Sequence, residues 1–249
     1  MRKINLLSGL VFSFLLLESC QKEASFSEDD NNQQNVSVDA NGNLSLNSDA
    51  DGAFYAIKQY MYDSYTGNTN DEFQYALAWF GSPASMKDGG DVTVNTIPVD
   101  FIGGVNYYMY IGFDVLFSGN STAWTASGNS GNGISAFNHT DNSAFPSGGY
   151  FTLPAKINIA NSFTLNYTAT GNVAGTVYEV IGTKGTKRKA VGGASSSVTF
   201  SPAEMQEVAN TADAIAFTVM PVSYTTASYG GKKYYFVKQS QYARETETQ

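Results

Sequence analysis

The chain has 249 residues, of which 42% are hydrophobic, and its 22 acidic and 14 basic residues give a formal net charge of −8. An acidic chain argues against nucleic acid or anionic lipid as the main partner, because phosphate binding requires a positive potential. Charged residues make up only 14% of the chain, below the ~25% typical of globular domains. Cys20 is the single cysteine, so no internal disulfide can form and stability must come from apolar burial.

The N-terminus has the features of an export signal. Arg2 and Lys3 precede a mostly apolar run, residues 4–17, which suits a signal peptide and is too short to span a bilayer. Leu17, Ser19 and Cys20 match the bacterial lipoprotein box, although Glu18 departs from the usual small or apolar residue. We therefore predict a signal peptide over 1–19, lipidation of Cys20, and an outer-membrane anchor on the periplasmic or cell-surface face. The alternative is an ordinary or uncleaved signal with an incidental cysteine.

The next stretch is polar and leads into the first strands. Residues 20–35 contain one aromatic residue and no hydrophobic periodicity, which predicts a flexible tether. Asn41-Gly42 lies between two short segments of alternating residues, 36–38 and 44–46, and this arrangement predicts a β-hairpin.

Strand patterns then follow one another. Between 73 and 79, large apolar side chains alternate with Gln and Ala, so one face of a strand is apolar. Residues 92–94 and 105–113 show the same alternation, and glycine-rich turns separate the segments. Residues 118–149 are the least regular part. Their glycines, Gly128, Gly131 and Gly133, do not fit the spacing of a phosphate-binding loop and predict a flexible surface loop.

The C-terminal hundred residues predict a second group of strands. Short groups of apolar residues, most at alternate positions, occur at 157–159, 163–167, 177–181, 198–200, 215–219 and 234–237. Ser201, Pro202 and Glu204 form an N-terminal capping pattern, which predicts a short helix over 202–209. The fold class is therefore all-β, with an N-terminal β-sandwich domain at 36–149 and an immunoglobulin-like sandwich at 150–249.

Several short phrases carry a resemblance to known proteins. They are the Cys20-Gln21-Lys22 start, residues 89–95, the loop at 124–128, residues 134–139 before Phe145-Pro146, and residues 231–236. In these the chain resembles the uncharacterised surface lipoproteins of Bacteroidota-type genomes. The resemblance implies an envelope location and a β fold, and it transfers no activity and no functional residue.

Residues suited to catalysis are sparse. His139 is the only histidine, and it has Ser135, Asp141 and Ser143 nearby in sequence, but no nucleophile-elbow pattern is present. A single histidine also cannot build a His-rich zinc site. A carboxylate pair of the glycoside-hydrolase kind has no sequence signature here. We therefore predict no enzyme, no cofactor and no metal, and keep a glycoside hydrolase as the weaker alternative.

Two groups of residues are candidates for contact with a ligand. Tyr60, Tyr62, Tyr108 and Tyr110 are predicted on faces away from the core, where aromatic rings can stack on sugars or fill peptide pockets. The second group consists of four basic residues predicted at a hairpin tip, where they could contact an anionic glycan. Its members are Lys184, Lys187, Arg188 and Lys189.

These observations favour a lipid-anchored envelope protein that binds an extracellular protein or glycan without catalysis. The alternative from another class is a fimbrial or adhesin-type structural subunit, for which exposed strand edges would be the signature.

Overall fold

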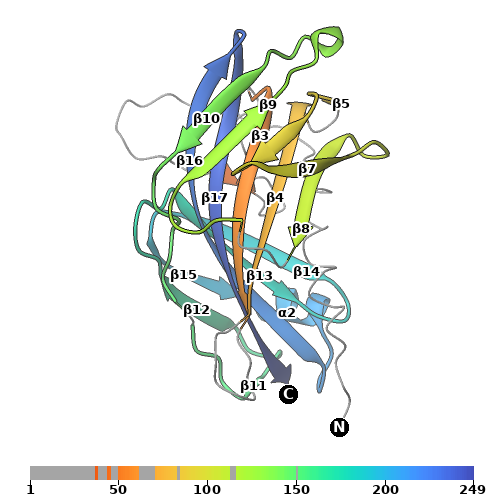
Figure 1. Ribbon diagram of the computed structural model, residues 1–249. Helices are drawn as coiled ribbons and strands as arrows, with labels where there is room; N and C mark the ends of the chain where they lie inside the picture. Colours follow the sequence, from red (N-terminus) through yellow and green to blue (C-terminus); the bar gives the residue numbers. More distant parts are fainter. Residues whose placement is uncertain are drawn as a thin grey trace.

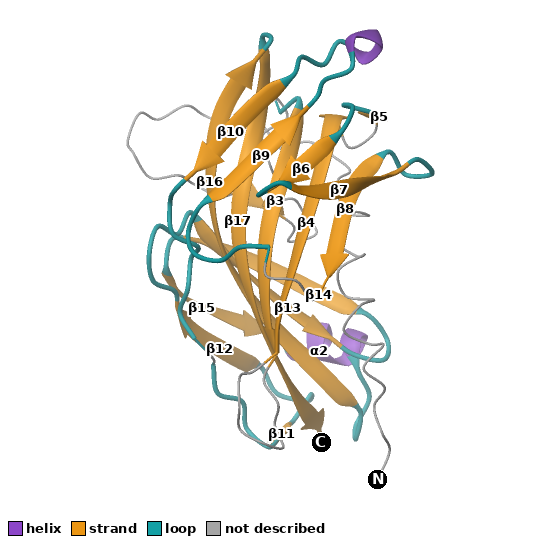
Figure 2. Cartoon of the chain, in the orientation of Figure 1, coloured by secondary structure: helices purple, strands orange, loops and turns teal. Residues whose placement is uncertain are grey.

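The computed structural model describes residues 37–38, 44–45, 50–61, 71–82, 85–112, 116–149 and 151–249. Most of these residues lie in β-strands, and the described part contains a single short α-helix (Figures 1 and 2). The predicted signal peptide and tether lie outside the described residues. No helix of the described part has the length and apolarity needed to cross a membrane. The predicted all-β sandwich fold is confirmed.

A large mixed sheet forms the centre of the fold, with β5 and β11 added beside β4 and β17. Its strand order is β10-β9-β6-β7-β8-β4-β3-β17-β16-β13-β14. The strands of this sheet are β3 (Gly52–Met61), β4 (Asp71–Ser82), β5 (Ser85–Lys87), β6 (Val92–Val94), β7 (Ile97–Ile102), β8 (Tyr107–Gly112), β9 (Thr122–Ala126), β10 (Phe137–Asp141), β11 (Lys156–Ile157), β13 (Gly175–Ile181), β14 (Thr186–Gly192), β16 (Ala214–Tyr229) and β17 (Lys232–Thr248).

Two short pairs complete the strands. β1 (Ser37–Val38) pairs with β2 (Leu44–Ser45) where the hairpin was predicted, and its Asn41-Gly42 turn lies outside the described residues. β12 (Phe163–Thr168) pairs with β15 (Ser195–Phe200) as a separate two-stranded sheet.

The hairpin of β16 and β17 runs through the whole molecule (Figure 1). β17 has 17 residues and pairs on its other side with β3, in parallel, from Tyr234↔Gly52 to Ala243↔Met61. The sequence predicted only 215–219 and 234–237 of these strands, because the residues beyond them lose their apolar alternation. The C-terminal hairpin therefore pairs directly with the first long strand of the chain.

The upper layer forms because the sheet folds back on itself at β7. Residues 97–99 of β7 pair with β6, whereas 100–102 pair with β8. β6, β9 and β10 consequently lie over β4, β3 and β17 (Figure 2). Phe54 is at the centre of the aromatic core between them, with its ring centroid 5.1–6.0 Å from those of five others. The five are Phe80, Trp124, Phe137, Tyr234 and Phe236.

A lower layer covers the other end of the same face. β12 and β15 pack over β13, β16 and β17, with Phe200, Phe217 and Val219 in the core. Helix α2 (Pro202–Val208) closes this core, and the predicted capping box of Ser201 and Glu204 is confirmed. Since β16 and β17 contribute to both cores, two sandwiches share one sheet. The domain boundary at residue 149 stays a prediction.

The interpretation of 118–149 as the least regular part holds for most of these residues, but two short strands occur within it. β9 and β10 lie there, and their Trp124 and Phe137 are buried in the upper core. The inward residues of β9 are Thr122, Trp124 and Ala126, of which only one is large, so the apolar alternation is weak. The glycines do form a turn around the 3-10 helix η1 (Ser130–Asn132).

Close packing under the upper layer gives a first prediction. A Cβ added to Gly89 would lie 2.1 Å from the Phe80 ring, which is fully buried. We expect Gly89→Ala to destabilise the protein by about 1–3 kcal/mol, because the ring has no room to move. Urea unfolding measures the loss. Gly104→Ala is the matched control, since nothing lies within 4 Å of its added Cβ. Equal stability of the two variants would contradict the packing described.

Candidate functional site

A row of polar side chains separates the two cores on the covered face of the sheet. We call it the polar belt: Lys58, Gln74, Ser223, Lys238 and Ser240. Strand alternation places these residues on the same face as the apolar residues two positions away, such as Phe236 and Tyr242 in β17. The belt is where loops of the upper layer cross the sheet: the Gln74 side chain accepts a hydrogen bond of 2.6 Å from the Phe117 backbone N–H.

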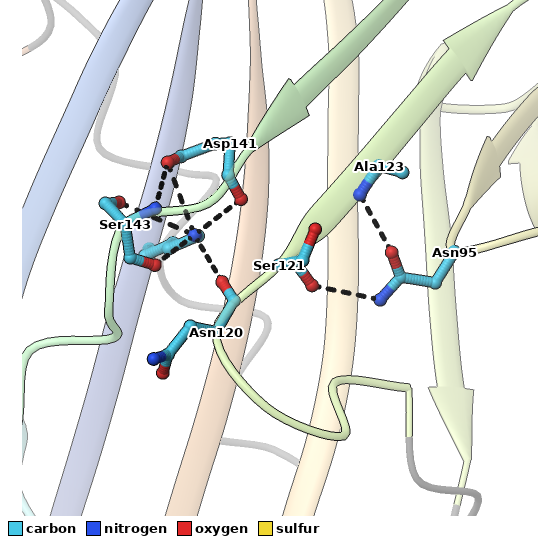
Figure 3. A network of polar contacts seen from close by, with 7 residues as sticks. Asn95, Asn120, Ser121, Ala123, Asp141 and Ser143 are labelled. Atoms are coloured by element: carbon cyan, nitrogen blue, oxygen red, sulfur yellow. Dashed lines mark hydrogen bonds and ion pairs between the residues drawn. The ribbon is translucent and has the colours of Figure 1, made fainter.

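Lys238 makes the most extensive contacts in the belt. Its side chain is 1% exposed, and its Nζ donates to the carbonyl oxygens of Asn120 (2.6 Å), Ser143 (2.6 Å) and Asp141 (3.0 Å). The Asp141 carboxylate lies 3.4 Å from Nζ and is also buried. Figure 3 shows these oxygens converging from both sides of the β9–β10 hairpin. One ammonium group therefore fixes both ends of that hairpin to β17.

The hydrogen-bond acceptors around Lys238 favour the charged form of its side chain. Burial lowers the pKa of Lys238, and Asp141 opposes this effect. Three carbonyl oxygens and a carboxylate can only accept, so the contacts use all three ammonium protons. A neutral amine would leave buried carbonyls without donors, which is costly. Lys238 therefore acts as a charged structural link in this geometry. The Ser143 hydroxyl lies 3.5 Å from Nζ, and a charged ammonium group cannot accept its proton.

Asn95 holds the same hairpin from the opposite side. Its side-chain nitrogen donates to the carbonyls of Leu116 (2.7 Å) and Ser121 (3.4 Å), and its side-chain oxygen accepts from the Ala123 N–H at 2.8 Å (Figure 3). Asn95 sits in the β6–β7 turn with a φ of 48°. The β6–β7 turn is thus bonded to β9, the strand that pairs with β6.

A third network ties the start of β6 to the glycine turn. The Tyr108 hydroxyl contacts an Asp88 carboxylate oxygen at 2.7 Å, and the Asn129 amide donates to the other oxygen at 3.2 Å. These hydrogen bonds and one from the Gly90 N–H lower the pKa of Asp88, whereas burial raises the pKa of Tyr108. The upper layer is therefore held by polar contacts at several points of its rim.

The exposed large apolar residues of the described part belong to one hairpin but not to one of its faces. Among the described residues, the large hydrophobic side chains that are exposed are Phe101 (39%), Val105 (51%) and Ile111 (40%). All three belong to β7, β8 and the turn between them, which extends to the side of the molecule (Figure 1). The register places Phe101 beside Tyr108 of the upper core, whereas Ile111 lies beside Tyr75 on the opposite face, so Phe101 and Ile111 do not share one patch. We call residues 97–112 the β7–β8 hairpin.

The predicted aromatic platform is not formed as expected. Tyr108 is 1% exposed and belongs to the upper core, so its prediction as a ligand-contacting ring is wrong. Pairing with Asp88 lets its hydroxyl enter the core. Tyr110 is half-buried against the same core. Tyr60 is half-buried and stacks on Tyr242 with ring centroids 5.0 Å apart. Tyr62 lies outside the described residues.

The predicted basic cluster is engaged within the chain. Lys184 lies in the turn between β13 and β14, at a hairpin tip as predicted, whereas Lys187, Arg188 and Lys189 lie along β14, so the predicted placement of these three is corrected. Lys187 pairs with Glu207, Arg188 with the buried Glu179, and Lys189 with Glu204 at 2.8 Å, while Lys184 donates to the Gln206 carbonyl. These contacts hold α2 and β13 to β14. A role in anion binding stays a prediction, and the pairing argues against it.

The side chains of His139 and Asp141 have partners other than each other. His139 Nδ1 lies 3.0 Å from the Tyr229 hydroxyl, while the Asp141 carboxylate faces Lys238. No group of three or more His, Cys, Asp or Glu residues in the described part is placed to hold a metal ion.

Comparisons with known proteins add little to this geometry. No family model and no curated protein matches the chain. A solved structure, from work on host cell surface retention of a 1.5-MDa bacterial ice-binding adhesin, is similar over 79% of this chain, with 17% identity and a TM-score of 0.26. This chain spans 65% of that chain. A likeness this small carries no argument about function.

The buried ammonium gives a second prediction. We expect Lys238→Met to destabilise the protein by about 3–5 kcal/mol, because Asp141 is left buried without its counter-charge. The double variant K238M/D141L should recover part of this loss, since both charges are then absent. Thermal and urea unfolding measure both effects.

Lys156→Met is the matched control, because the Lys156–Glu247 pair is exposed and spans 3.4 Å. Such exposed pairs contribute about 0–1 kcal/mol. If the Lys238 and Lys156 variants were equally stable, the buried contacts would not be stabilising.

Proposed function

We propose that this protein is a lipid-anchored component of the bacterial outer envelope that binds an extracellular protein through the β7–β8 hairpin, without catalysis. The observation that carries the proposal is that Phe101, Val105 and Ile111, the exposed large hydrophobic side chains of the described residues, all belong to one hairpin. The leader and Cys20 support the envelope location.

The hairpin has the chemistry of a protein contact more than of a glycan contact. Its only charged residue is Asp100, and half-buried Ile102, Met109 and Tyr110 extend the apolar character beside the exposed residues. Apolar and aromatic side chains dominate the energetics of protein interfaces. Of the Tyr rings predicted to stack on sugars, Tyr108 is a core residue and Tyr60 and Tyr110 are half-buried, which weakens the case for a glycan.

The backbone around the hairpin supports a functional role. Asn95, Thr96 and Asn106 have φ values of 48°, 70° and 55°, and they lie in the two turns that flank β7. A β-branched residue such as Thr96 rarely adopts this left-handed conformation, which costs about 1–3 kcal/mol. Strain of this kind persists where surrounding contacts impose it, and Asn95 supplies three such hydrogen bonds.

A third prediction tests the hairpin directly. In the full-length protein on its native cells, a photo-crosslinking amino acid at position 101 or 105 should capture the same protein, whereas one at the exposed Thr164 of β12 should not. Phe101→Ser should then abolish capture from position 105, because the apolar contact is lost. The readout is the identity of the adduct by mass spectrometry.

Two results would contradict this proposal. Capture from 164 as strong as from 105 would show that the hairpin is not the contact surface. Adducts linking two copies of this chain would favour the alternative of a structural subunit that assembles with itself.

A fourth prediction concerns the anchor. Mass spectrometry of the mature protein should find an acylated Cys20 as the N-terminal residue, and Cys20→Ala should release the protein from the membrane fraction. Acyl chains contribute about 0.8 kcal/mol of membrane affinity per buried methylene. Retention of Met1, or an unmodified Cys20, would rule the anchor out.

A further inference from the structure

We propose that His139 makes the attachment of the β9–β10 layer sensitive to pH, so that uptake of a proton in mild acid loosens this layer before the rest of the fold. His139 lies in β10, opposite Trp124 of β9, and its ring stacks on Phe236 of β17 with centroids 3.5 Å apart and an interplanar angle of 14°. The histidine is thus part of the contact between the layer and the sheet.

The two nitrogens of His139 face different surroundings. Nδ1 lies 3.0 Å from the Tyr229 hydroxyl, which also lies 3.2 Å from the Asn138 carbonyl oxygen. Nε2 is buried and has no hydrogen-bond partner. An imidazolium carries a hydrogen on both nitrogens, so the protonated ring leaves an Nε2–H buried without an acceptor.

The surroundings of the ring oppose a second proton. The charged or titratable groups near it are Asp141 on its own strand, Lys238 on β17 and Tyr229 on β16. Burial lowers the pKa of His139, the Lys238 ammonium lowers it further, and the Asp141 carboxylate partly opposes both. Tyr229 stays neutral through the acid range, since burial raises its pKa.

The sign of the effect follows from proton linkage. The unfolded or detached chain binds a proton on histidine near its ordinary pKa of about 6.5, whereas the attached layer does so only at lower pH. The attached state is therefore fully favoured above pH 6.5 and loses stability as the pH falls from there toward the lowered value. Detachment separates the imidazole from Phe236 and exposes Nε2 to water. The described carboxylates with lowered pKa values, Asp88, Glu204 and Asp213, act in a separate window at about pH 4.

One buried group acts in the opposite direction. Burial raises the pKa of Glu179 in the lower half of the sheet, so its contribution to stability falls as the pH rises above its ordinary value. A comparison of the wild-type protein with a His139 variant cancels this contribution, because Glu179 is the same in both.

The fifth prediction uses the fact that His139 is the only histidine in the chain. NMR titration of the full mature protein should give a single imidazole curve with a midpoint below 6.5. Amide exchange of β9 and β10, corrected for intrinsic rates, should accelerate by up to about tenfold between pH 7 and pH 5.5. Exchange in β12 and β15 should stay constant. His139→Phe, which keeps the stack and removes the titrating nitrogen, should abolish the acceleration.

Several outcomes would overturn the proposal. A native midpoint at or above 6.5 would show that protonation is not opposed in the fold. Equal acceleration in β12 and β15 would mean global unfolding in place of local release. The same acceleration in His139→Phe would assign it to other groups. Should that variant fail to fold, the titration and exchange profile of the wild-type protein still decide the matter.

Discussion

The contact on which the rest of this structure depends is the ammonium of Lys238 among the oxygens of Asn120, Asp141 and Ser143. A charge this deeply buried is costly unless every proton finds an acceptor. The two ends of the β9–β10 hairpin provide those acceptors, so the cost of burying the charge depends on the hairpin being in place. The interaction therefore makes the position of the upper layer specific in a way that apolar packing alone does not.

The polar belt explains how one sheet carries two cores. β17 is apolar at Tyr234–Val237, polar yet buried at Lys238–Gln241, and packs again at Tyr242. Without the belt, the upper and lower layers could slide along a continuous apolar face. With it, each layer is confined to its own end, and the long hairpin of β16 and β17 joins the two halves. The β7–β8 hairpin, for which we propose a binding role, extends from this frame.

Much of the fold could be predicted from the sequence, and the site could not. The alternation at 73–79 and the capping residues Ser201 and Glu204 act locally, so their strand and helix were visible. β9 was missed because only one of its three inward residues, Trp124, is large. Tyr108 was misplaced because its hydroxyl meets Asp88, a partner twenty residues away. Lys238, which is far from its acceptors in sequence, gave no local signal at all, and a buried lysine is rare enough that none would be expected.

The most direct test of this account observes the Lys238 ammonium itself. In a proton–nitrogen NMR spectrum of lysine side chains at neutral pH, exposed ammonium groups exchange with water too quickly to be detected, whereas one held by three carbonyls exchanges slowly. The account predicts a persistent ammonium signal that disappears in Lys238→Met. Absence of this signal from the wild-type protein, or its survival in the variant, would contradict it.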